Sequence, residues 1–592
     1  MPSLSALPPG GLLILGGLLL PILPGRWRSG WMLALPILSG LQLLAVRQAF
    51  PEGGTWTFAL LDYQLVPVQV DRLSLVWGVI FHMAALLCAV YALPIKDAVQ
   101  QVTALVYAGA ALGAVFAGDL LTLFVYWELT AISSVFLIWA RRTERSYRAG
   151  MRYLIIQVGS GVILLAGILL HLRDTGSLAF REAFYHALPA TDATWWGLNS
   201  PGTALIFLAF GIKAAFPLLH NWLADAYPEA TVPGTVYLSI FTTKLAIYTL
   251  ARGFPGTGIL VGIGATMTVF PLFYALLEND LRRAMTYILN NQLGFMVVGI
   301  GLANFARSPE VAQLALNGTA AHAFAHILYE GLLFMALGAV LYRRGTIHSS
   351  QLGRLYPSMP WTAACCLVGA ASISGFPLLS GFVTKSMIVT AAAEQHRTVV
   401  WLVLLFASVG VFLVAGIKIP RAAFFGRGPG PQVSEAPPPM LAAMIGGAAL
   451  CLILGIWPGG LYALLPYPVT YQPYTVSHVI VQLQLLAFTG LAYAGLRRAA
   501  LFPVAQPSVN LDTDWFYRRL LPAVVARLVG EIRQLGSAVA AGVRQVLQAF
   551  LAWVRQQCDP GGVFGRSWST GGMVIWAAML LGAYLILYYL ER

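Results

Sequence analysis

Long apolar segments recur from one end of this chain to the other, and they restrict its fold more than any other feature. Each is about 17 to 25 residues long, the length that a helix needs to cross the hydrocarbon core of a bilayer. Backbone polar groups in lipid must be satisfied within the segment, so such runs form helices. We therefore predict an all-α polytopic membrane protein with about sixteen transmembrane helices, at 11–24, 30–47, 73–93, 102–119, 120–140, 150–170, 201–218, 232–252, 257–276, 284–304, 314–342, 361–393 (broken), 400–417, 439–463, 477–497 and 571–590.

The composition agrees with a bilayer environment. Hydrophobic residues make up 58% of the chain and charged residues 10%, with a mean hydropathy of +0.75, outside the range of soluble domains. The opening stretch MPSLSALPPGG has no basic segment. We therefore expect the first helix to belong to the fold, in contrast to a cleaved signal.

Basic residues predict the orientation. Arginine supplies 31 of the 36 basic residues, and with sixteen spans the basic connections share one face, which the positive-inside rule makes cytoplasmic. Both termini then face outward, in a bacterial cytoplasmic (inner) membrane. The net charge of +13 reflects this topology, and we predict no binding of nucleic acid. The clusters are Arg26 and Arg28; Arg141, Arg142, Arg145, Arg148 and Arg152; Arg343, Arg344 and Arg354; Lys418, Arg421 and Arg427; and Arg497 and Arg498.

The five cysteines offer no redox or metal framework. Four lie within apolar helices, Cys558 lies in a basic stretch, and no C-x-x-C occurs. The sequence also has no nucleotide-binding loop. We expect no cofactor, no metal site and no catalytic residues.

Three of only five lysines lie inside apolar helices: Lys213, Lys244 and Lys385. A buried amine can gain and lose a proton, whereas arginine stays charged. Glu128 lies about eight residues inside the fifth helix. Charges at bilayer depth are costly and are usually functional or paired. Snorkelling to the interface is the alternative, but it explains three mid-depth lysines poorly, so we predict proton handling.

Prolines interrupt two of these helices. Phe216-Pro217-Leu218-Leu219 and Phe376-Pro377-Leu378-Leu379 share one tetrapeptide, each in a long apolar segment that also holds a buried lysine. Proline lacks the backbone N–H and clashes with the preceding turn. Paired broken helices in two halves of a chain are typical of an internal repeat in a transporter.

His322, His326 and Glu330 are spaced i, i+4, i+8, so they share one helical face. A proton relay, a metal site and imidazoles satisfied by neighbouring helices are the three interpretations. We favour the relay, because two turns is too far for three ligands on one straight helix to converge.

Between the fifteenth and sixteenth helices, the apolar residues from Leu521 to Val554 repeat at helical spacing, and Arg533, Arg544 and Arg555 recur every eleven residues. This predicts an amphipathic helix along the membrane surface. Some 35 residues extend roughly 50 Å, which favours a strut along a neighbouring subunit over an ordinary interfacial helix.

Three runs carry a resemblance to a known family. IKAAFPLLHNWLADAYPEATVPGTVYLSIFTTKLAIYTLAR, ENDLRRAMTYILNNQLGFMVVGIG and HAFAHILYEGLLFM resemble the proton-conducting antiporter-like subunits shared by Mrp-type multisubunit cation/proton antiporters and respiratory complex I. The chain is most similar to the D-type subunit of Mrp antiporters, over roughly 70–420.

The resemblance implies two inverted five-helix repeats and a role for each buried charge. Glu128 and Lys213 form a pair whose association stabilises the charged lysine and whose opening passes a proton to Lys244. From there protons reach His322, His326 and Lys385. His220, Asp225 and Glu229, which follow the first break, are candidates for proton uptake.

Two features depart from the family pattern. Glu330 stands where the histidine helix often carries a lysine, so it could pair with Lys385 or Lys244, or alter the ion used. The amphipathic helix is atypical of the D-type Mrp subunit and resembles the lateral helix of the largest antiporter-like subunit of complex I. This chain is then expected to be the terminal member of its complex and to embrace a neighbouring subunit.

The expected organisation is 1–100 (helices 1–3), 101–253 (first repeat), 254–420 (second repeat), 421–498 (helices 14 and 15), 499–560 (linker and lateral helix) and 561–592 (anchor). We predict a proton-translocating subunit of a multisubunit cation(Na⁺)/proton antiporter, which assembles with other integral membrane subunits and exchanges protons for Na⁺ or K⁺. The alternatives are a proton-pumping subunit of a complex I-type redox enzyme and the membrane subunit of an inorganic-carbon uptake complex. A haem- or metal-binding enzyme and a structural scaffold rank last.

Overall fold

The computed structural model describes residues 7–180, 198, 200–304, 308–426, 432–501 and 512–591. The chain divides into two units, Met1–Asn510 and Leu511–Arg592, and each is described by itself. Most of the predicted 499–510 linker, and Arg427, lie outside the described residues.

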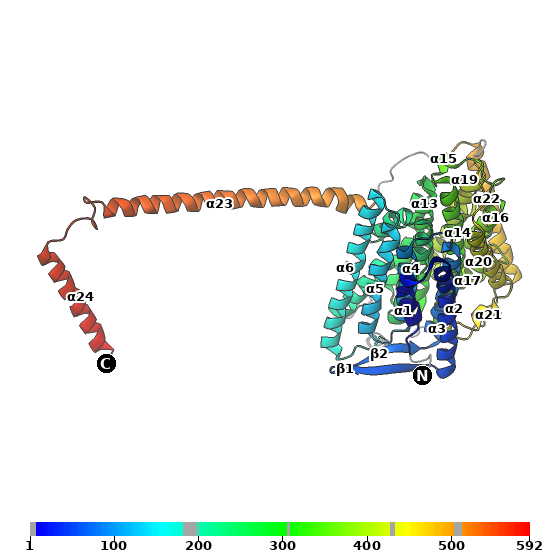
Figure 1. Ribbon diagram of the computed structural model, residues 1–592, viewed down its shortest axis with the longest axis horizontal. Helices are drawn as coiled ribbons and strands as arrows, with labels where there is room; N and C mark the ends of the chain where they lie inside the picture. Colours follow the sequence, from blue (N-terminus) through cyan, green and yellow to red (C-terminus); the bar gives the residue numbers. More distant parts are fainter. Residues whose placement is uncertain are drawn as a thin grey trace. The chain divides into compact units, whose positions relative to one another are not determined.

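The first unit is a bundle of helices with one hairpin (Figure 1). Its elements are α1 (Gly11–Leu18), η2 (Leu20–Ile22), α2 (Gly25–Ala49), β1 (Gly54–Leu60), β2 (Tyr63–Val70), α3 (Arg72–Ala92), α4 (Ala98–Phe116), α5 (Leu120–Trp139), α6 (Glu144–Thr175), α8 (Pro201–Lys213), α9 (Asn221–Ala226), η3 (Tyr227–Glu229), α10 (Val232–Ile240), α11 (Thr242–Gly253), α12 (Ile259–Leu277), α13 (Leu281–Leu302), α14 (Pro309–Arg344), α15 (Ser349–Leu352), α16 (Pro360–Ser374), α17 (Ser380–Glu394), α18 (Thr398–Val411), η4 (Phe412–Lys418), α19 (Ile419–Phe424), α20 (Pro438–Ile456), α21 (Gly459–Tyr462) and α22 (Val476–Arg498).

The predicted spans are confirmed as helices. In the described part of the chain, 13 helices are long and apolar enough to cross a membrane, and one of these is the predicted lateral helix. Four further predicted spans are built from shorter pieces: α1 with η2, α8, α10 with α11, and α16 with α17. The chain is therefore a multi-pass membrane protein.

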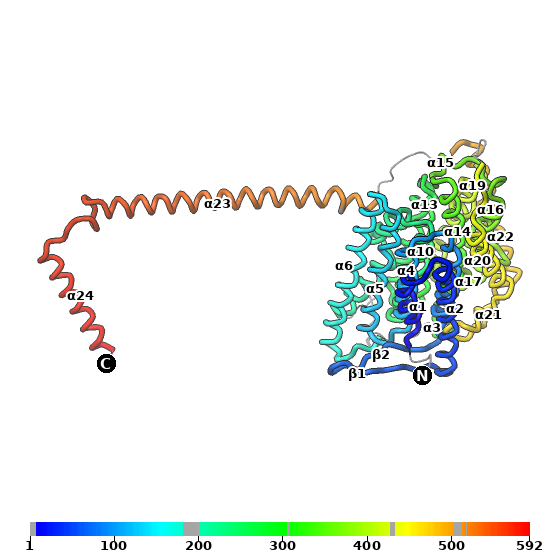
Figure 2. The backbone as a smooth tube through the Cα atoms, in the orientation of Figure 1, coloured from blue at the N-terminus to red at the C-terminus, as the bar shows by residue number. Residues whose placement is uncertain are grey.

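Helix α14 lies at the centre of the unit. It contacts α10, α13, α16, α17 and α20 (Figure 2). In the most apolar part of α14, 94% of the residues are buried, and the most apolar part of α13 is buried completely. Both helices nevertheless carry polar side chains, among them Asn290, Gln292 and His326. Buried polar groups therefore concentrate at the centre of the bundle.

The two broken helices share one backbone geometry. Leu218 and Leu378, which follow the prolines, have φ values of 71° and 70°. The Phe216 amide donates to the Gly211 carbonyl at 3.0 Å, and the Phe376 amide donates to the Ala371 carbonyl at 3.1 Å. Each residue of the first break lies 160 positions before its counterpart, so the two breaks are copies of one motif.

A second pair of features repeats at the N-termini of α5 and α13. Asp119 and Asp280 cap these helices, and each forms a single β-bridge with the connection after a long helix. Asp119 lies beside β2, whereas the partner of Asp280 directly precedes α15, and these two elements lie at opposite ends of the unit (Figure 1). The repeats are therefore inverted.

The hairpin β1–β2 was not predicted. Its strands pair antiparallel from Gly54 opposite Val70 to Leu60 opposite Tyr63. The Val66 amide donates to Asp119 Oδ2 at 2.7 Å, and the Gly118 amide donates to the Val66 carbonyl at 2.8 Å. The hairpin thus covers the connection between α4 and α5.

The structure also breaks the eighth span, for which the sequence predicts a continuous helix over 232–252. Helix α10 ends at Ile240 and α11 begins at Thr242. The Thr242 amide donates to the Tyr107 hydroxyl at 2.9 Å instead of to a helix carbonyl. A side chain inserted into the hydrogen-bond ladder interrupts a helix in this way.

The thirteenth span contains a π-helical turn, η4, which ends at Lys418. The sequence places Lys418 at a helix end in a basic connection, but its ammonium is buried. It donates to the carbonyls of Ala275 at 2.8 Å, Leu276 at 2.7 Å and Glu278 at 2.8 Å. Lys418 thereby satisfies carbonyl groups that the end of α12 leaves without helical partners.

The second unit contains η5 (Phe516–Leu520), α23 (Leu521–Cys558) and α24 (Thr570–Leu590). Helix α23 has 38 residues, none of them buried, and is about 57 Å long at 1.5 Å per residue. It confirms the predicted long helix, and α24 confirms the predicted sixteenth span.

Candidate functional site

Lys213 is the last residue of α8, directly before the first break, and is fully buried. Its ammonium donates to the Trp127 carbonyl at 3.0 Å and to Thr130 Oγ1 at 2.8 Å. It also lies 3.9 Å from the centre of the Trp127 ring, a cation–π geometry. Neutral groups of α5 therefore hold this amine.

Glu128, the predicted partner of Lys213, lies within electrostatic range of it but not in direct contact. Its carboxylate rests against Gly161 of α6, and Oε1 is buried without a hydrogen bond. The structure thus brings the two residues to one region and shows them separated.

Lys244 lies in the first turn of α11 and is fully buried. Its ammonium donates to the Ser239 carbonyl, one of the groups released by the break between α10 and α11. Glu330 of α14 is the carboxylate that acts electrostatically on Lys244. Of the two partners that the sequence leaves open for Glu330, Lys244 is the one with which it interacts electrostatically.

The three residues on α14 face one another along the helix. His326 Nε2 lies 3.3 Å from Glu330 Oε2, and the rings of His326 and His322 are 6.1 Å apart. His322 Nδ1 lies 3.3 Å from Thr384 Oγ1 of α17. The row therefore reaches from Glu330 to the helix that carries Lys385.

Lys385 belongs to α17, after the second break. Its ammonium donates to the Ile373 carbonyl at 3.4 Å and lies 5.3 Å from the centre of the Phe295 ring. Gln482 of α22 donates to the next carbonyl, Ser374, at 3.1 Å. Side chains thus occupy the carbonyl groups that the break exposes, as a membrane interior requires.

The lysines differ in their position relative to the two breaks. Lys213 precedes Pro217 by four residues, whereas Lys385 follows Pro377 by eight. At the repeat separation of 160, Lys385 corresponds to Asp225 and Lys213 to Ile373. The repeats share a backbone but place their charges differently.

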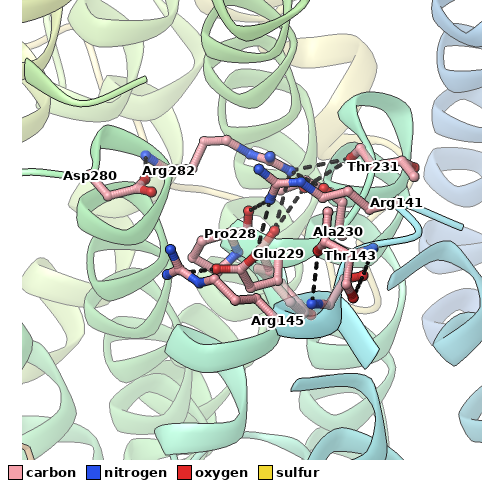
Figure 3. A network of polar contacts seen from close by, with 12 residues as sticks. Arg141, Thr143, Arg145, Pro228, Glu229, Ala230, Thr231, Asp280 and Arg282 are labelled. Atoms are coloured by element: carbon pink, nitrogen blue, oxygen red, sulfur yellow. Dashed lines mark hydrogen bonds and ion pairs between the residues drawn. The ribbon is translucent and has the colours of Figure 1, made fainter. Parts of the chain in front are cut away.

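Of the candidates for proton uptake, Asp225 and Glu229 form ion pairs with arginines that lie near the connection between α5 and α6. Arg152 Nε lies 2.6 Å from Asp225 Oδ2, and Arg145 lies 3.0 Å from Glu229 Oε1. Figure 3 shows Arg145 and Arg141 on either side of Glu229. His220 packs its ring on Phe270, with ring centres 4.6 Å apart.

Sequence reasoning missed Arg282, which is buried beside Glu229. It donates to the carbonyls of Tyr227 at 3.3 Å, Ala230 at 3.0 Å and Thr231 at 3.2 Å (Figure 3). Its position at the start of an apolar helix is a signal that could have been read from the sequence.

Two further polar groups were missed. Asn290, Asn291 and Gln292 form a buried run on α13, and the Tyr329 hydroxyl lies 3.4 Å from Gln292 Oε1 and 3.5 Å from His322 Nε2. Three consecutive amide side chains within an apolar helix are a signal in the sequence that could have indicated a buried polar cluster. Their contact with the histidine row depends on packing between α13 and α14.

The other missed group is an ion pair at the end of α11. Arg252 Nη1 lies 2.8 Å from Asp71 Oδ2, and Arg252 Nε donates to the Tyr248 hydroxyl at 2.8 Å. Lys244, Tyr248 and Arg252 recur every four residues on α11, so they share one face. Nothing near Asp71 in the sequence indicates a partner 181 residues away.

No group of three or more His, Cys, Asp or Glu side chains gathers as metal ligands in the described part of the chain. The arrangement is instead a series of titratable side chains in the interior of the bundle. The lysines donate hydrogen bonds to neutral oxygen atoms, and His326 lies beside the carboxylate of Glu330. Such a series, with paired broken helices, is the architecture of membrane proteins that transport ions.

Comparison with known proteins makes the class specific. A family model described as NADH:quinone oxidoreductase/Mrp antiporter, TM, matches residues 117–412, which is half of the chain. The chain belongs to this family.

Three curated relatives show the range of the family. Hydrogenase-4 component B of Escherichia coli is 30% identical over 433 residues, covering 67% of this chain and 63% of the relative. In Alkalihalophilus pseudofirmus, the A-type subunit of a Na(+)/H(+) antiporter is 28% identical over 477 residues, covering 73% of this chain and 58% of the relative. The D-type subunit of a Na(+)/H(+) antiporter from the same organism is 29% identical over 328 residues, covering 53% of this chain and 63% of the relative. The chain thus spans less than two thirds of each relative, and it matches the A-type subunit over a longer stretch than the D-type.

Solved structures share the fold. A chain of the Mrp complex from Dietzia sp. superposes with a TM-score of 0.69 at 20% identity, over 85% of this chain and 100% of that chain. A chain of respiratory complex I from Thermus thermophilus gives 0.67 at 20% identity, over 82% and 100%.

Proposed function

We propose that this chain is a proton-translocating subunit of a multisubunit membrane complex. The observation that carries the proposal is Lys213, a fully buried amine at a helix break, held by neutral acceptors with a carboxylate in range but not in contact. An amine in this setting can switch between charged and neutral forms as the carboxylate approaches or withdraws.

The remaining charges extend the route through both repeats, which we place at 101–253 and 254–420. Protons pass from the Glu128–Lys213 pair to Lys244 and then, through Glu330, His326 and His322, to Lys385. Intervening water connects the groups whose separations exceed a hydrogen bond. We assign proton uptake to the region of His220, Asp225 and Glu229.

We propose that the complex exchanges protons for Na⁺ or K⁺. Relatives named as subunits of Na(+)/H(+) antiporters support this exchange. We also propose that the chain performs no redox or hydrolytic chemistry of its own. Its termini face the outside of a bacterial inner membrane, because the arginine-rich connections belong on the cytoplasmic face.

The second candidate is a proton-pumping subunit of a redox-driven complex. The relative named Hydrogenase-4 component B, and the shared fold with an archaeal membrane-bound sulfane sulfur reductase and with complex I, favour it. In that case, redox proteins will co-purify with the chain, and an applied cation gradient will not drive proton movement.

The proposal is tested with the intact complex, purified through this chain and reconstituted in liposomes that contain a pH-sensitive dye. We expect Lys213→Ala to abolish proton flux driven by a Na⁺ or K⁺ gradient, or by electron transfer, without loss of assembly. Lys213→Arg is expected to be nearly as inactive, since arginine cannot release its proton. Wild-type flux in the alanine variant contradicts the proposal.

A further inference from the structure

The carboxylate of Glu128 occupies a space on α6 that exists because residue 161 is glycine. A Cβ built on Gly161 would overlap Glu128 Oε1, and the three nearest atoms to that position all belong to the Glu128 side chain. Gly159, half a turn earlier on the same helix, has no atom within 4 Å of the corresponding position. The space at Gly161 is therefore matched to one side chain.

This space adjoins the turn of α5 that binds Lys213. Ser160, next to Gly161, accepts a hydrogen bond from Trp127 Nε1 at 3.3 Å and donates to the Ala209 carbonyl at 2.9 Å. Ala209 lies one turn before Lys213 on α8. The carbonyl of Trp127 in turn accepts from Lys213. Residues 160 and 161 thus lie where α5, α6 and α8 meet.

Two observations indicate that this position of Glu128 is one of two. Oε1 is buried and makes no hydrogen bond, and a buried carboxylate oxygen without a donor is costly although the Glu128 side chain as a whole is only half-buried. Lys213, the charged group that acts on it, is in electrostatic range. Rotation of the flexible Glu128 side chain is the movement that would take the carboxylate from the space at Gly161 towards the lysine.

The part of α6 around Gly161 carries no charged side chain from Tyr153 to Leu170, which makes the separated position possible. Its neighbouring polar groups on the helix are Gln157, one turn before Gly161, and Ser160. Tyr153, two turns before, is held by Ser134 Oγ at 2.8 Å. None of these side chains supplies a charge that would hold the carboxylate permanently, and within the described part of the chain Lys213 is the charged group that acts on Glu128.

We propose that Gly161 is a positioning residue: the space over its Cα receives the Glu128 carboxylate whenever that carboxylate is separated from Lys213. Without this space the carboxylate stays beside the lysine and stabilises its charged form. The inference rests on the proposed Glu128–Lys213 pair and adds the structural element that permits the pair to open.

The test uses the reconstituted complex and the dependence of proton flux on pH. Gly161→Ala fills the space, so we expect the pH of half-maximal flux to rise by about one pH unit or more, because an adjacent carboxylate favours the protonated amine. Flux at neutral pH falls accordingly. Gly159→Ala, the matched control, is expected to keep the wild-type pH profile.

A second pair of variants separates positioning from general damage. In a Glu128→Gln background, Gly161→Ala is expected to leave the pH profile of Glu128→Gln unchanged, because no carboxylate remains to be displaced. If Gly161→Ala alone prevents assembly, Glu128→Ala in the same chain should restore it by emptying the space.

A wild-type pH profile in Gly161→Ala overturns the inference, as does an undiminished shift on the Glu128→Gln background or a failure of Glu128→Ala to restore assembly. Each of these results leaves the role of Lys213 intact. That role fails separately, if Lys213→Ala retains its flux.

Discussion

At the scale of single residues, Arg252 is a buried charge with a full set of partners. Its guanidinium forms two contacts with Asp71 and a third with the Tyr248 hydroxyl. Asp71 also caps α3 through Ser74. Burial raises the pKa of the Asp71 carboxyl. The charge of Arg252 and the hydrogen bonds from Arg252 and Ser74 lower that pKa by more, so the pKa lies below its ordinary value.

We predict that Asp71→Asn destabilises the chain by roughly 2 to 3 kcal/mol. This loss of unfolding free energy is smaller than that expected when one partner of a fully buried ion pair is removed, because Asp71 is partly exposed. The change leaves Arg252 buried without a counter-charge. Thermal unfolding of the detergent-solubilised complex measures the effect, and an unchanged midpoint contradicts it.

The same pair predicts a direction with pH. The pKa of Asp71 is lower in the folded chain than in the unfolded chain, so its contribution is complete above about pH 4, the ordinary value for aspartate. It is lost as the pH falls through the folded-state pKa. We therefore expect the difference in unfolding free energy between wild type and Asp71→Asn to be constant above about pH 4 and to become smaller as the pH falls below it.

A proline alone does not predict a helix break in this chain. Pro36 and Pro271 lie inside the continuous helices α2 and α12, whereas Pro217 and Pro377 accompany breaks. The repeated tetrapeptide, together with a nearby lysine, identified the two real breaks from the sequence. The acceptors of Lys213 could not be predicted, since Trp127 and Thr130 lie more than 80 residues away.

At the scale of elements, apolar length predicted the helices but not their interruptions. The break at Phe241 depends on the Tyr107 hydroxyl, which belongs to a distant helix. The hairpin left a readable signal, since threonine alternates with aromatic residues at Thr55, Trp56, Thr57 and Phe58. Length-based reasoning passes over such a short segment between two spans.

The lateral helix α23 predicts a dependence on neighbouring subunits. The second unit by itself buries no residue of α23 or α24, and α23 carries an apolar stripe that needs cover. We expect a chain that ends after residue 498 to fold but to lose partner subunits during purification in detergent. Retention of every partner at the wild-type ratio contradicts this role.

At the scale of the whole molecule, the buried charges connect two inverted copies of one motif. Sequence reasoning identified the members of the row and their order along the chain. It could not show that Glu128 and Lys213 are separated, that Glu330 acts on Lys244, or that Arg282 and Arg252 are buried in the same unit. These facts arise from packing between helices that are far apart in sequence.

Lys244 offers the most direct test of the route, because it belongs to the first repeat, interacts with Glu330 of the second repeat, and has no part in the Glu128–Lys213 pair. The measurement is proton flux through the assembled, reconstituted complex with Lys244→Ala, compared with wild type in the same liposomes. A continuous route through both repeats predicts that flux is lost although every subunit is present. Wild-type flux in this variant would show that protons do not pass through the central row.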